Sequence, residues 1–260
     1  MINSSQSKKG WIFNKKYSFF QSKLLKDNGF NHAFLTSKSS KSFNEILKNF
    51  SSNCIIYKNI QVHSNKVIST LDIKDKKWIK GDAIISEGEG IKCLKLYTAD
   101  CIPILIGDLL TKQVASCHVG WRGVSNKILL NIVKKFEKNG TTVNNLIFAL
   151  GPSISKKNYE FSKELSVEIF RSIFTSNLQG LSKNDTIYHM KELKIIDESI
   201  NEGKCYFDIK KTCILQLNYL GIDCKHISSC KNCTYEDSHL FYSFRRNKDY
   251  FRQISFIISS

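Results

Sequence analysis

The strongest pattern of apolar positions lies near the centre of the chain. Residues 102–106 form a continuous apolar run, typical of a strand buried on both faces, and residues 107–108 supply a turn signal. Residues 114–119 have the pattern of a second short strand, and the brief connection favours an antiparallel pair. Apolar residues then recur at helical spacing over residues 128–136, and Asn139-Gly140 is a typical helix end.

Weaker patterns extend this prediction to both ends of the chain. An edge strand or turn is expected within residues 1–20, and residues 176–204 give no definite prediction. Further strands are predicted at 30–36, 54–57, 60–62, 80–85, 91–97, 146–150, 241–243 and 253–258. Further helices are predicted at 43–50, at 165–174, and from an N-cap at Asp208 to Gly221.

The order of these elements indicates the fold class. Strands and helices do not alternate as a regular βαβ series, so we expect a mixed α/β fold with largely antiparallel β-sheets flanked by helices. A chain of 260 residues can bury a full core, and no Pro/Gly/Ser-rich linker divides it. The expectation is therefore a single domain over residues 1–260.

Composition narrows the setting in which the protein works. No apolar run reaches the length of a membrane span, and the N-terminal segment lacks the apolar core of a secretory signal. The nine cysteines are odd in number and lack framework spacing, which favours reduced thiols. A cytoplasmic protein without a membrane partner is expected.

The net charge of +16 raises the alternative of a nucleic-acid-binding protein. The lysines are spread along the whole chain in short pairs, without a single basic helix or arm. This distribution favours a solvated lysine-rich surface with no nucleic-acid partner, and it would attract a small anionic substrate. A non-enzymatic basic binding protein remains the alternative that charge alone allows.

Three residues that can ligate a metal lie at the ends of predicted strands. Cys101 precedes the strand at 102–106, His118 is near the end of the strand at 114–119, and His63 follows the strand at 60–62. Neighbouring strands lie about 5 Å apart, so Cys101 and His118 can lie side by side. One thiolate and two imidazoles with an open fourth position are typical of catalytic zinc. Spacing alone leaves open that each is a separate surface or core residue.

Other polar residues near the ends of the predicted strands each allow two interpretations. Asp82 and Asp100 can orient metal ligands or simply form caps and turns. Arg122, at a strand-to-helix elbow, can bind phosphate or pair with a carboxylate, and Arg245 and Arg246 share this ambiguity. Ordinary core or surface roles are expected for Cys117, Cys230, Cys233, His32, His189, His226 and His239.

Several motifs resemble, in order, those of one protein family. The pair TADC at 98–101 and HVGWRG at 118–123 is its most specific signature. The other matching segments are QVHSNKV (61–67), GDAIIS (81–86), GPSISKKNYEF (151–161), YFDI (206–209) and CTYEDSHLFYSFRRNKDYFRQISFI (233–257). The chain thus resembles the YfiH family, also called the multicopper polyphenol oxidoreductase (laccase) family, whose human relative is laccase domain-containing protein.

The resemblance implies a zinc-dependent purine nucleoside phosphorylase that also deaminates adenosine. Its substrates would be phosphate and adenosine, inosine, guanosine or methylthioadenosine. His63 of QVH, Cys101 of TADC and His118 of HVGWRG would be the zinc ligands and catalytic residues. The implied fold is an α/β sandwich related to the cysteine hydrolase-like domain of cytotoxic necrotizing factors.

The chain departs from the family pattern at an N-terminal loop. The family has Thr-Arg followed by Gly-Gly where this chain reads TSKSS at 36–40. Lys38 therefore offers a point charge in place of a bidentate guanidinium, which bears on phosphate affinity and substrate preference. Lys38, Arg122 and Arg245 are the candidate substrate-binding residues.

The family name raises the alternative of copper chemistry, because a His2Cys set is also the equatorial set of a blue-copper site. A multicopper laccase also needs a trinuclear copper cluster, and the six histidines of this chain are too few to build one. No methionine lies near the three candidate ligands in the sequence to act as an axial ligand, so zinc is favoured. A hydrolase that edits peptidoglycan precursors is a further alternative suggested by relatives. The sequence leaves the preferred nucleoside and the oligomeric state open.

Overall fold

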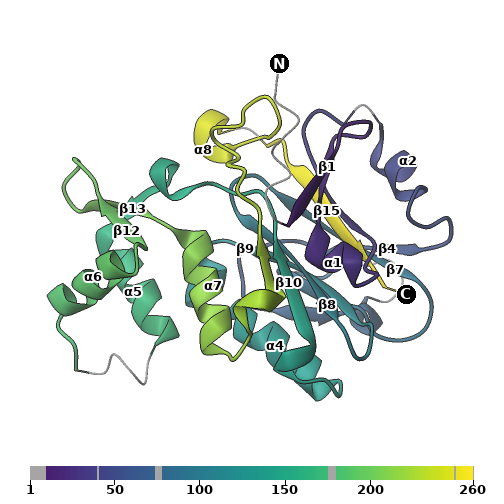
Figure 1. Ribbon diagram of the computed structural model, residues 1–260, viewed down its shortest axis with the longest axis horizontal. Helices are drawn as coiled ribbons and strands as arrows, with labels where there is room; N and C mark the ends of the chain where they lie inside the picture. Colours follow the sequence, from purple (N-terminus) through teal and green to yellow (C-terminus); the bar gives the residue numbers. More distant parts are fainter. Residues whose placement is uncertain (1–9, 40, 74–77, 175–179, 249, 260) are drawn as a thin grey trace.

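Two six-stranded sheets form the body of the protein in the computed structural model, which describes residues 10–39, 41–73, 78–174, 180–248 and 250–259. A smaller three-stranded sheet with its own helices lies to one side of this body (Figure 1). Within the described ranges, no helix is long and apolar enough to cross a membrane.

The first large sheet contains the C-terminal strand in its interior. Its order is β1 (Trp11–Asn14), β2 (Phe19–Ser22), β3 (His32–Leu35), β15 (Gln253–Ile258), β7 (Lys92–Thr98) and β4 (Ile55–Tyr57). Neighbouring strands are antiparallel except β4 and β7. The first and last thirds of the chain therefore meet in one sheet.

The second large sheet is built around the central pair predicted from sequence. Its order is β14 (Ile227–Ser229), β10 (Leu146–Leu150), β8 (Ile102–Asp108), β9 (Val114–Val119), β6 (Ala83–Ile85) and β5 (Val67–Ser69). Every residue of β8 and β9 is buried, as the continuous apolar run at 102–106 predicts for β8. In the antiparallel β8–β9 register, Pro103 lies opposite His118.

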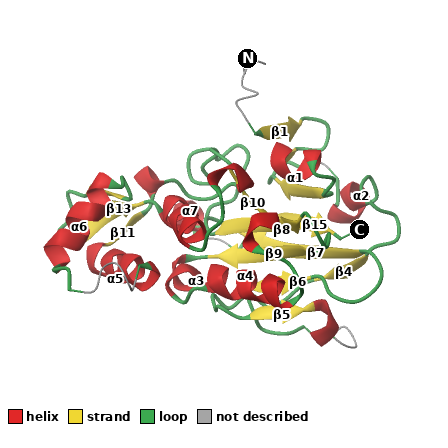
Figure 2. Ribbon diagram, turned by 60° about the horizontal axis from the view of Figure 1, so that its bottom comes forward, coloured by secondary structure: helices red, strands yellow, loops and turns green. Residues whose placement is uncertain are grey.

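Helices and the two sheets divide the core into layers (Figure 2). Phe34, Leu96 and Leu105 belong to the cluster between the large sheets, while Cys117 and Ile128 belong to the cluster under the helices. The helices are α1 (Lys23–Asp27), α2 (Phe43–Leu47), α3 (Trp121–Ser125), α4 (Ile128–Lys138), α5 (Lys163–Ile173), α6 (Lys183–Glu192), α7 (Ile209–Tyr219) and α8 (Phe244–Asn247). The short 3-10 turns are η1 (Thr70–Asp72), η2 (Val143–Asn145), η3 (Lys156–Asn158) and η4 (Cys224–His226).

The small sheet accounts for the segment that the sequence left undefined. It consists of β11 (Glu160–Ser162), β13 (Lys204–Phe207) and β12 (Ile196–Glu198), all antiparallel. Helix α6 begins at a capping box formed by Ser182 and Asp185. Residues 176–204 thus hold α6, β12 and the start of β13, apart from 176–179, which lie outside the described residues.

The expected class, a mixed α/β fold with largely antiparallel sheets, is confirmed, but two predicted strands are wrong. Residues 60–62 form only one isolated bridge, between Ile60 and Lys80. Residues 241–243 are not a strand because Ser243 caps α8. The predicted Asp208 cap is confirmed: its carboxylate accepts the Lys211 N–H at 2.8 Å. The edge strand expected within residues 1–20 is β1, which pairs with β2 at the edge of the first sheet, and residues 1–9 of that segment lie outside the described residues.

Candidate metal centre

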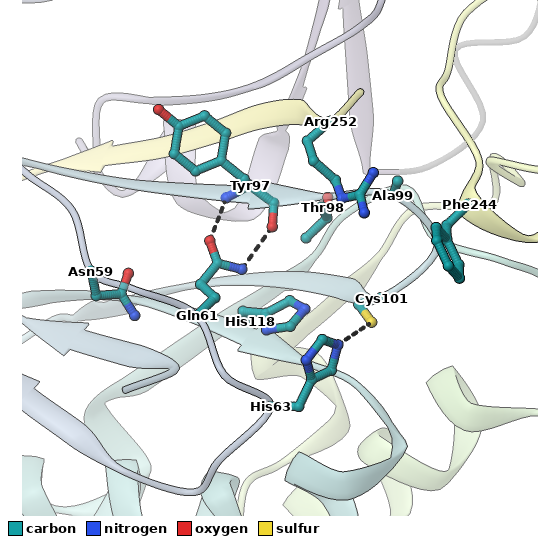
Figure 3. Close-up of a pocket in the computed structure, with 10 residues that line it drawn as sticks. All are labelled: Asn59, Gln61, His63, Tyr97, Thr98, Ala99, Cys101, His118, Phe244 and Arg252. Atoms are coloured by element: carbon teal, nitrogen blue, oxygen red, sulfur yellow. Dashed lines mark hydrogen bonds between the residues drawn. The ribbon is translucent and has the colours of Figure 1, made fainter. Parts of the chain in front are cut away.

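The structure brings the three candidate ligands together at one end of the second sheet. Cys101 directly precedes β8, His118 lies on the adjacent β9, and His63 comes from the loop before β5 (Figure 3). Their ligand atoms lie within 4.8 Å of one another, and Cys101 Sγ is 3.8 Å from His63 Nε2. His118 is buried, Cys101 is half-buried and His63 is exposed, so the group is open on one side.

Asp82, just before β6, fixes the orientation of the His118 ring. His118 Nδ1 donates to Asp82 Oδ1 at 2.8 Å, and the His118 backbone N–H donates to the Asp82 carbonyl at 2.7 Å. With the proton held at Nδ1, Nε2 is the nitrogen left to ligate a metal. A carboxylate behind a ligating histidine in this way is the usual support of a metal site.

The same carboxylate also shapes the turn that carries His63. Asp82 accepts the backbone N–H groups of Val62 at 3.2 Å, His63 at 3.0 Å and Ser64 at 2.6 Å, together with the Ser64 hydroxyl at 2.8 Å. This ring of donors holds His63 in a left-handed conformation with φ of 58°. His63 therefore reaches the site from a tight turn, and the predicted strand before it is replaced by this turn.

Burial opposes ionisation of Asp82, but the hydrogen bonds from His118 and Ser64 outweigh it and lower its pKa to about 2. Burial likewise opposes the charged form of Cys101, yet the charge and hydrogen bonds of His118 and His63 lower the pKa of its thiol to about 6. The Cys101 thiolate and Asp82 in turn outweigh burial at His118 and raise its pKa to about 9. The site thus favours the thiolate, which is the metal-ligating form of cysteine.

Gly120 allows the ligands to approach the backbone closely. A Cβ atom at this position would lie 3.0 Å from His63 Cδ2 and 3.1 Å from Cys101 Sγ. The φ of −94° is open to any residue, so the requirement here is space and not backbone freedom. The glycine at the start of the GWRG motif is therefore part of the wall behind the ligands.

Asp100 forms no hydrogen bond with His63 or His118. Its side chain instead anchors the C-terminal loop beside Cys101. Its carboxylate accepts the hydroxyls of Thr234 at 2.6 Å and Ser243 at 3.1 Å and the backbone N–H of Arg245 at 2.6 Å. Asp100 itself has a φ of 86°, an unusual conformation for a residue with a side chain. Of the two predicted supporting carboxylates, Asp82 contacts a ligand and Asp100 fixes a distant segment.

A cavity of about 430 Å³ opens directly onto the three candidate ligands. Gln61 bridges its wall: the side-chain amide donates to the Tyr97 carbonyl at 2.8 Å and accepts the Tyr97 N–H at 2.9 Å (Figure 3). Besides the ligands, the cavity is lined by Asn59, Gln61, Tyr97, Thr98, Ala99, Phe244 and Arg252, none of which was predicted as a site residue. Phe244 and Arg252 belong to the matching C-terminal segment, but nothing in the sequence places them beside Cys101.

The candidate substrate-binding cations occupy different places. The Arg122 guanidinium lies 4.4 Å from the centre of the Trp121 ring, and that of Arg245 lies 5.0 Å from the centre of the Tyr159 ring. Arg245 also donates to the Glu160 carbonyl at 3.0 Å. Within the described ranges, neither guanidinium pairs with a carboxylate. Lys38 is exposed and does not line the cavity.

Several other residues singled out in the sequence lie outside the cavity. Arg246 donates to the carbonyls of Thr234, Tyr235 and Phe241. His32 is buried, accepts the Ser22 N–H at 2.8 Å and is bonded to the Phe30 carbonyl. The core role expected for Cys117 is confirmed by its complete burial, and Cys230 and Cys233 are buried free thiols.

The donor set fits a single metal ion. Sulfur and two imidazole nitrogens suit zinc or copper, and three ligands beside a cavity leave a position open to a small molecule. Among the residues that the structure describes, this is the one group of three or more His, Cys, Asp or Glu side chains close enough to hold a metal. The fold and this group together define an α/β protein with a candidate mononuclear metal centre.

Residues 36–260 match the model of the family described as multi-copper polyphenol oxidoreductase laccase. Since the match spans most of the chain, the chain belongs to this family. It is 30% identical over 209 residues to a purine nucleoside phosphorylase of Synechocystis sp., covering 76% of this chain and 78% of the relative. It is 28% identical over 194 residues to adenosine deaminase RL5 of an unknown prokaryotic organism, covering 72% of this chain and 68% of the relative.

A solved structure of the same fold is that of the hypothetical protein YfiH from Bacillus licheniformis. The TM-score is 0.75 at 17% identity, and the alignment covers 94% of this chain and 97% of that one. The resemblance to the YfiH family is thereby confirmed in fold as well as in sequence.

Proposed function

We propose that this protein is a zinc-dependent purine nucleoside phosphorylase that also deaminates adenosine. The observation that carries the proposal is the cavity of about 430 Å³ whose floor is formed by His63, Cys101 and His118. This volume suits a small molecule of nucleoside size. The relatives named as a purine nucleoside phosphorylase and an adenosine deaminase support the same substrate class.

Zinc is proposed over copper on the basis of the surroundings of the site. A blue-copper site adds a weak axial ligand, usually methionine, to a His2Cys set. Met190 is buried in α6 and does not line the cavity, and Met1 lies outside the described residues. A zinc ion held by His63, Cys101 and His118 would supply Lewis acidity toward an oxygen of substrate or water.

The residues around the centre would divide the remaining work. Asp82 would keep the His118 proton at Nδ1 and hold His63 in place, so the ligand set needs little rearrangement when substrate binds. Gln61 would not read the base, since both ends of its amide are already bonded to Tyr97. Its role in the proposal is to keep the His63 loop attached to β7.

Phosphate is proposed to bind near Arg122 and Arg245. Both guanidinium groups lie on one aromatic cluster, in which Tyr159 contacts Phe161 and Phe161 contacts Trp121. Burial and the nearby charge of a Cys101 thiolate raise the pKa of Tyr159, so its hydroxyl would stay a neutral hydrogen-bond donor. Planar guanidinium groups bind phosphate oxygens in pairs, which suits an anionic co-substrate. Lys38 is kept as a further proposed cation.

The test combines metal analysis with turnover. Purified protein should contain about one zinc per chain and release free base from inosine and adenosine only when phosphate is present. Cys101→Ala should lose both zinc and activity, whereas Cys224→Ala, at an exposed thiol outside the cavity, should lose neither. Bound zinc without turnover of any purine nucleoside would overturn the proposal. Bound copper together with oxidation of phenols would instead support the alternative of a copper-dependent polyphenol oxidase.

A further inference from the structure

One large apolar side chain stands half-exposed in the wall of the cavity. Phe244 is 48% exposed, and its ring lies beyond Cys101 on the side of the cavity away from Gln61 (Figure 3). The other aromatic residue of the lining, Tyr97, directs its ring away from the three ligands in the same view. Leaving an aromatic ring open to water costs hydrophobic free energy that a bound planar molecule would recover.

The position of Phe244 is fixed relative to Cys101 by its two neighbours. The hydroxyl of Ser243 donates to Asp100 Oδ2 at 3.1 Å, and the backbone N–H of Arg245 donates to the same oxygen at 2.6 Å. Asp100 is the residue directly before Cys101. One carboxylate oxygen therefore ties both sides of Phe244 to the backbone of a candidate metal ligand, across 145 positions of sequence.

Further bonds hold the segment that carries Phe244. The Arg246 guanidinium binds the Thr234 carbonyl at 2.8 Å and the Phe241 carbonyl at 2.8 Å. Gln253, the first residue of β15, accepts the Tyr242 N–H at 3.0 Å and donates to the Tyr242 carbonyl at 3.2 Å. The ring is thus presented by a braced segment, and little ordering is needed when a ligand arrives.

We propose that the purine base stacks on the ring of Phe244 and that Asp100 is the residue that positions this ring. The inference rests on the proposed nucleoside substrate and names the residue that selects a planar base. The Arg252 guanidinium lies 5.6 Å from the centre of the Phe244 ring, so a cation and an aromatic face border the same side of the cavity. Such a pair favours the flat, electron-rich surface of a purine over an aliphatic group.

The first test compares Phe244 variants by steady-state kinetics. Phe244→Ala should raise KM for inosine and adenosine about 10- to 100-fold, the range expected for one lost base-stacking contact. The kcat, the KM for phosphate and the zinc content should change little, because the three ligands are untouched. Phe244→Tyr and Phe244→Trp should keep the nucleoside KM close to the wild-type value. Phe244→Leu should raise it, because the leucine side chain is apolar but not planar.

A second measurement separates this inference from the proposed reaction. Isothermal titration of free hypoxanthine and adenine should show binding to the wild type and a similar 10- to 100-fold weakening in Phe244→Ala. A nucleoside KM that is unchanged in Phe244→Ala, or that stays at the wild-type value in Phe244→Leu, would overturn the stacking role and leave the phosphorylase proposal standing. Base binding that depends on Phe244 without turnover would support stacking and overturn the reaction, and no purine binding at all would overturn both.

The role of Asp100 is tested by coupling. Asp100→Asn should raise the nucleoside KM, since its amide nitrogen cannot accept the hydrogen bonds that a carboxylate oxygen accepts. In the double variant with Phe244→Ala the KM should be no higher than in Phe244→Ala alone. Additive effects of the two changes, with zinc content retained, would show that Asp100 acts on something other than the ring.

Discussion

The Asp82 carboxylate accepts a hydrogen bond from His118 Nδ1 at 2.8 Å and another from the backbone N–H of His63, the second candidate histidine ligand, at 3.0 Å. The two imidazoles therefore depend on one acidic side chain that touches no metal-ligating atom. This arrangement couples the position of His63 to the tautomer of His118, and it can be broken by a change of one atom.

Asp82→Asn should weaken metal binding about 10- to 100-fold, as expected when the hydrogen-bonding support of a ligating histidine is lost. The amide nitrogen would face the donor groups of His118 or of the Ser64 turn, so part of the network must open. Zinc affinity measured by competition with a chromogenic chelator checks this. Asp108→Asn is the matched control, because Asp108 is equally buried but binds Thr111 and Thr141 at the far end of β8.

A methyl group at Gly120 should disturb the site without unfolding the protein. In Gly120→Ala the new Cβ would lie 3.0 Å from the His63 ring and 3.1 Å from the Cys101 sulfur, so one ligand must shift. Zinc affinity should fall at least tenfold, since ligand positions matter within a few tenths of an ångström.

Gly140→Ala provides the contrast to Gly120→Ala. Gly140 has a φ of 96° and no atom within 4 Å of an added Cβ. Its substitution should lower the free energy of unfolding by about 1 kcal/mol and leave zinc affinity unchanged. Equal zinc affinity in the two variants would show that Gly120 is not part of the ligand wall.

Arg122→Ala should raise the KM for phosphate about tenfold or more and leave the KM for inosine nearly unchanged, because one charge-assisted contact would be lost. Arg122→Lys should recover only part of this effect, since an ammonium group cannot bind two oxygens in a fixed fork. Lys38→Ala, measured in parallel, decides whether the exposed lysine contributes. A change in the inosine KM alone would place Arg122 on the nucleoside side of the site.

Acid should destabilise the protein through His32, which lies on β3 in the first sheet, whereas the candidate ligands lie at the end of the second sheet. Burial, opposed by the Phe30 carbonyl and helped by Lys26, lowers the pKa of His32 from 6.5 to about 4. Below pH 6.5 the unfolded chain binds this proton and the folded chain does not, so stability is lost as the pH falls from 6.5 toward 4. The full loss is about 3 kcal/mol at 1.36 kcal/mol per pKa unit.

Urea unfolding of the Cys101→Ser protein at pH 7, 5.5 and 4.5 checks this effect without interference from metal release. His32→Gln should flatten the pH dependence over that window. His239→Gln, at an exposed histidine, should not. A steep dependence that survives His32→Gln would assign the acid sensitivity to other groups.

The sequence predicts the centre of this fold well because its pattern there is unambiguous. The run at 102–106 is continuously apolar and 114–119 is a short, mostly apolar segment close behind it, so two buried antiparallel strands and the approach of Cys101 to His118 are predicted. The sequence predicts a short strand at 60–62 that ends at His63. In the structure the Gln61 side chain bonds the Tyr97 backbone where a strand would, and Asp82 turns the chain at His63.

What the sequence could not supply is proximity between distant loops. Phe244 and Asp100 carry no periodic signal, and only the folded chain brings Ser243 and Arg245 to the carboxylate. Helix α6 was missed for a different reason, because most of its residues are polar or exposed and only Thr186 and Met190 are buried. Its capping box at Ser182 and Asp185 was a readable signal at the start of that helix.

The place of β15 between β3 and β7 makes the order of synthesis matter. Until Gln253–Ile258 is available, β3 and β7 each keep an open edge, and the wall residue Arg252 just before that strand has no fixed place. A growing chain would thus carry all three candidate ligands before it can enclose them. The first sheet and the wall of the cavity near Cys101 are therefore completed by the same C-terminal segment.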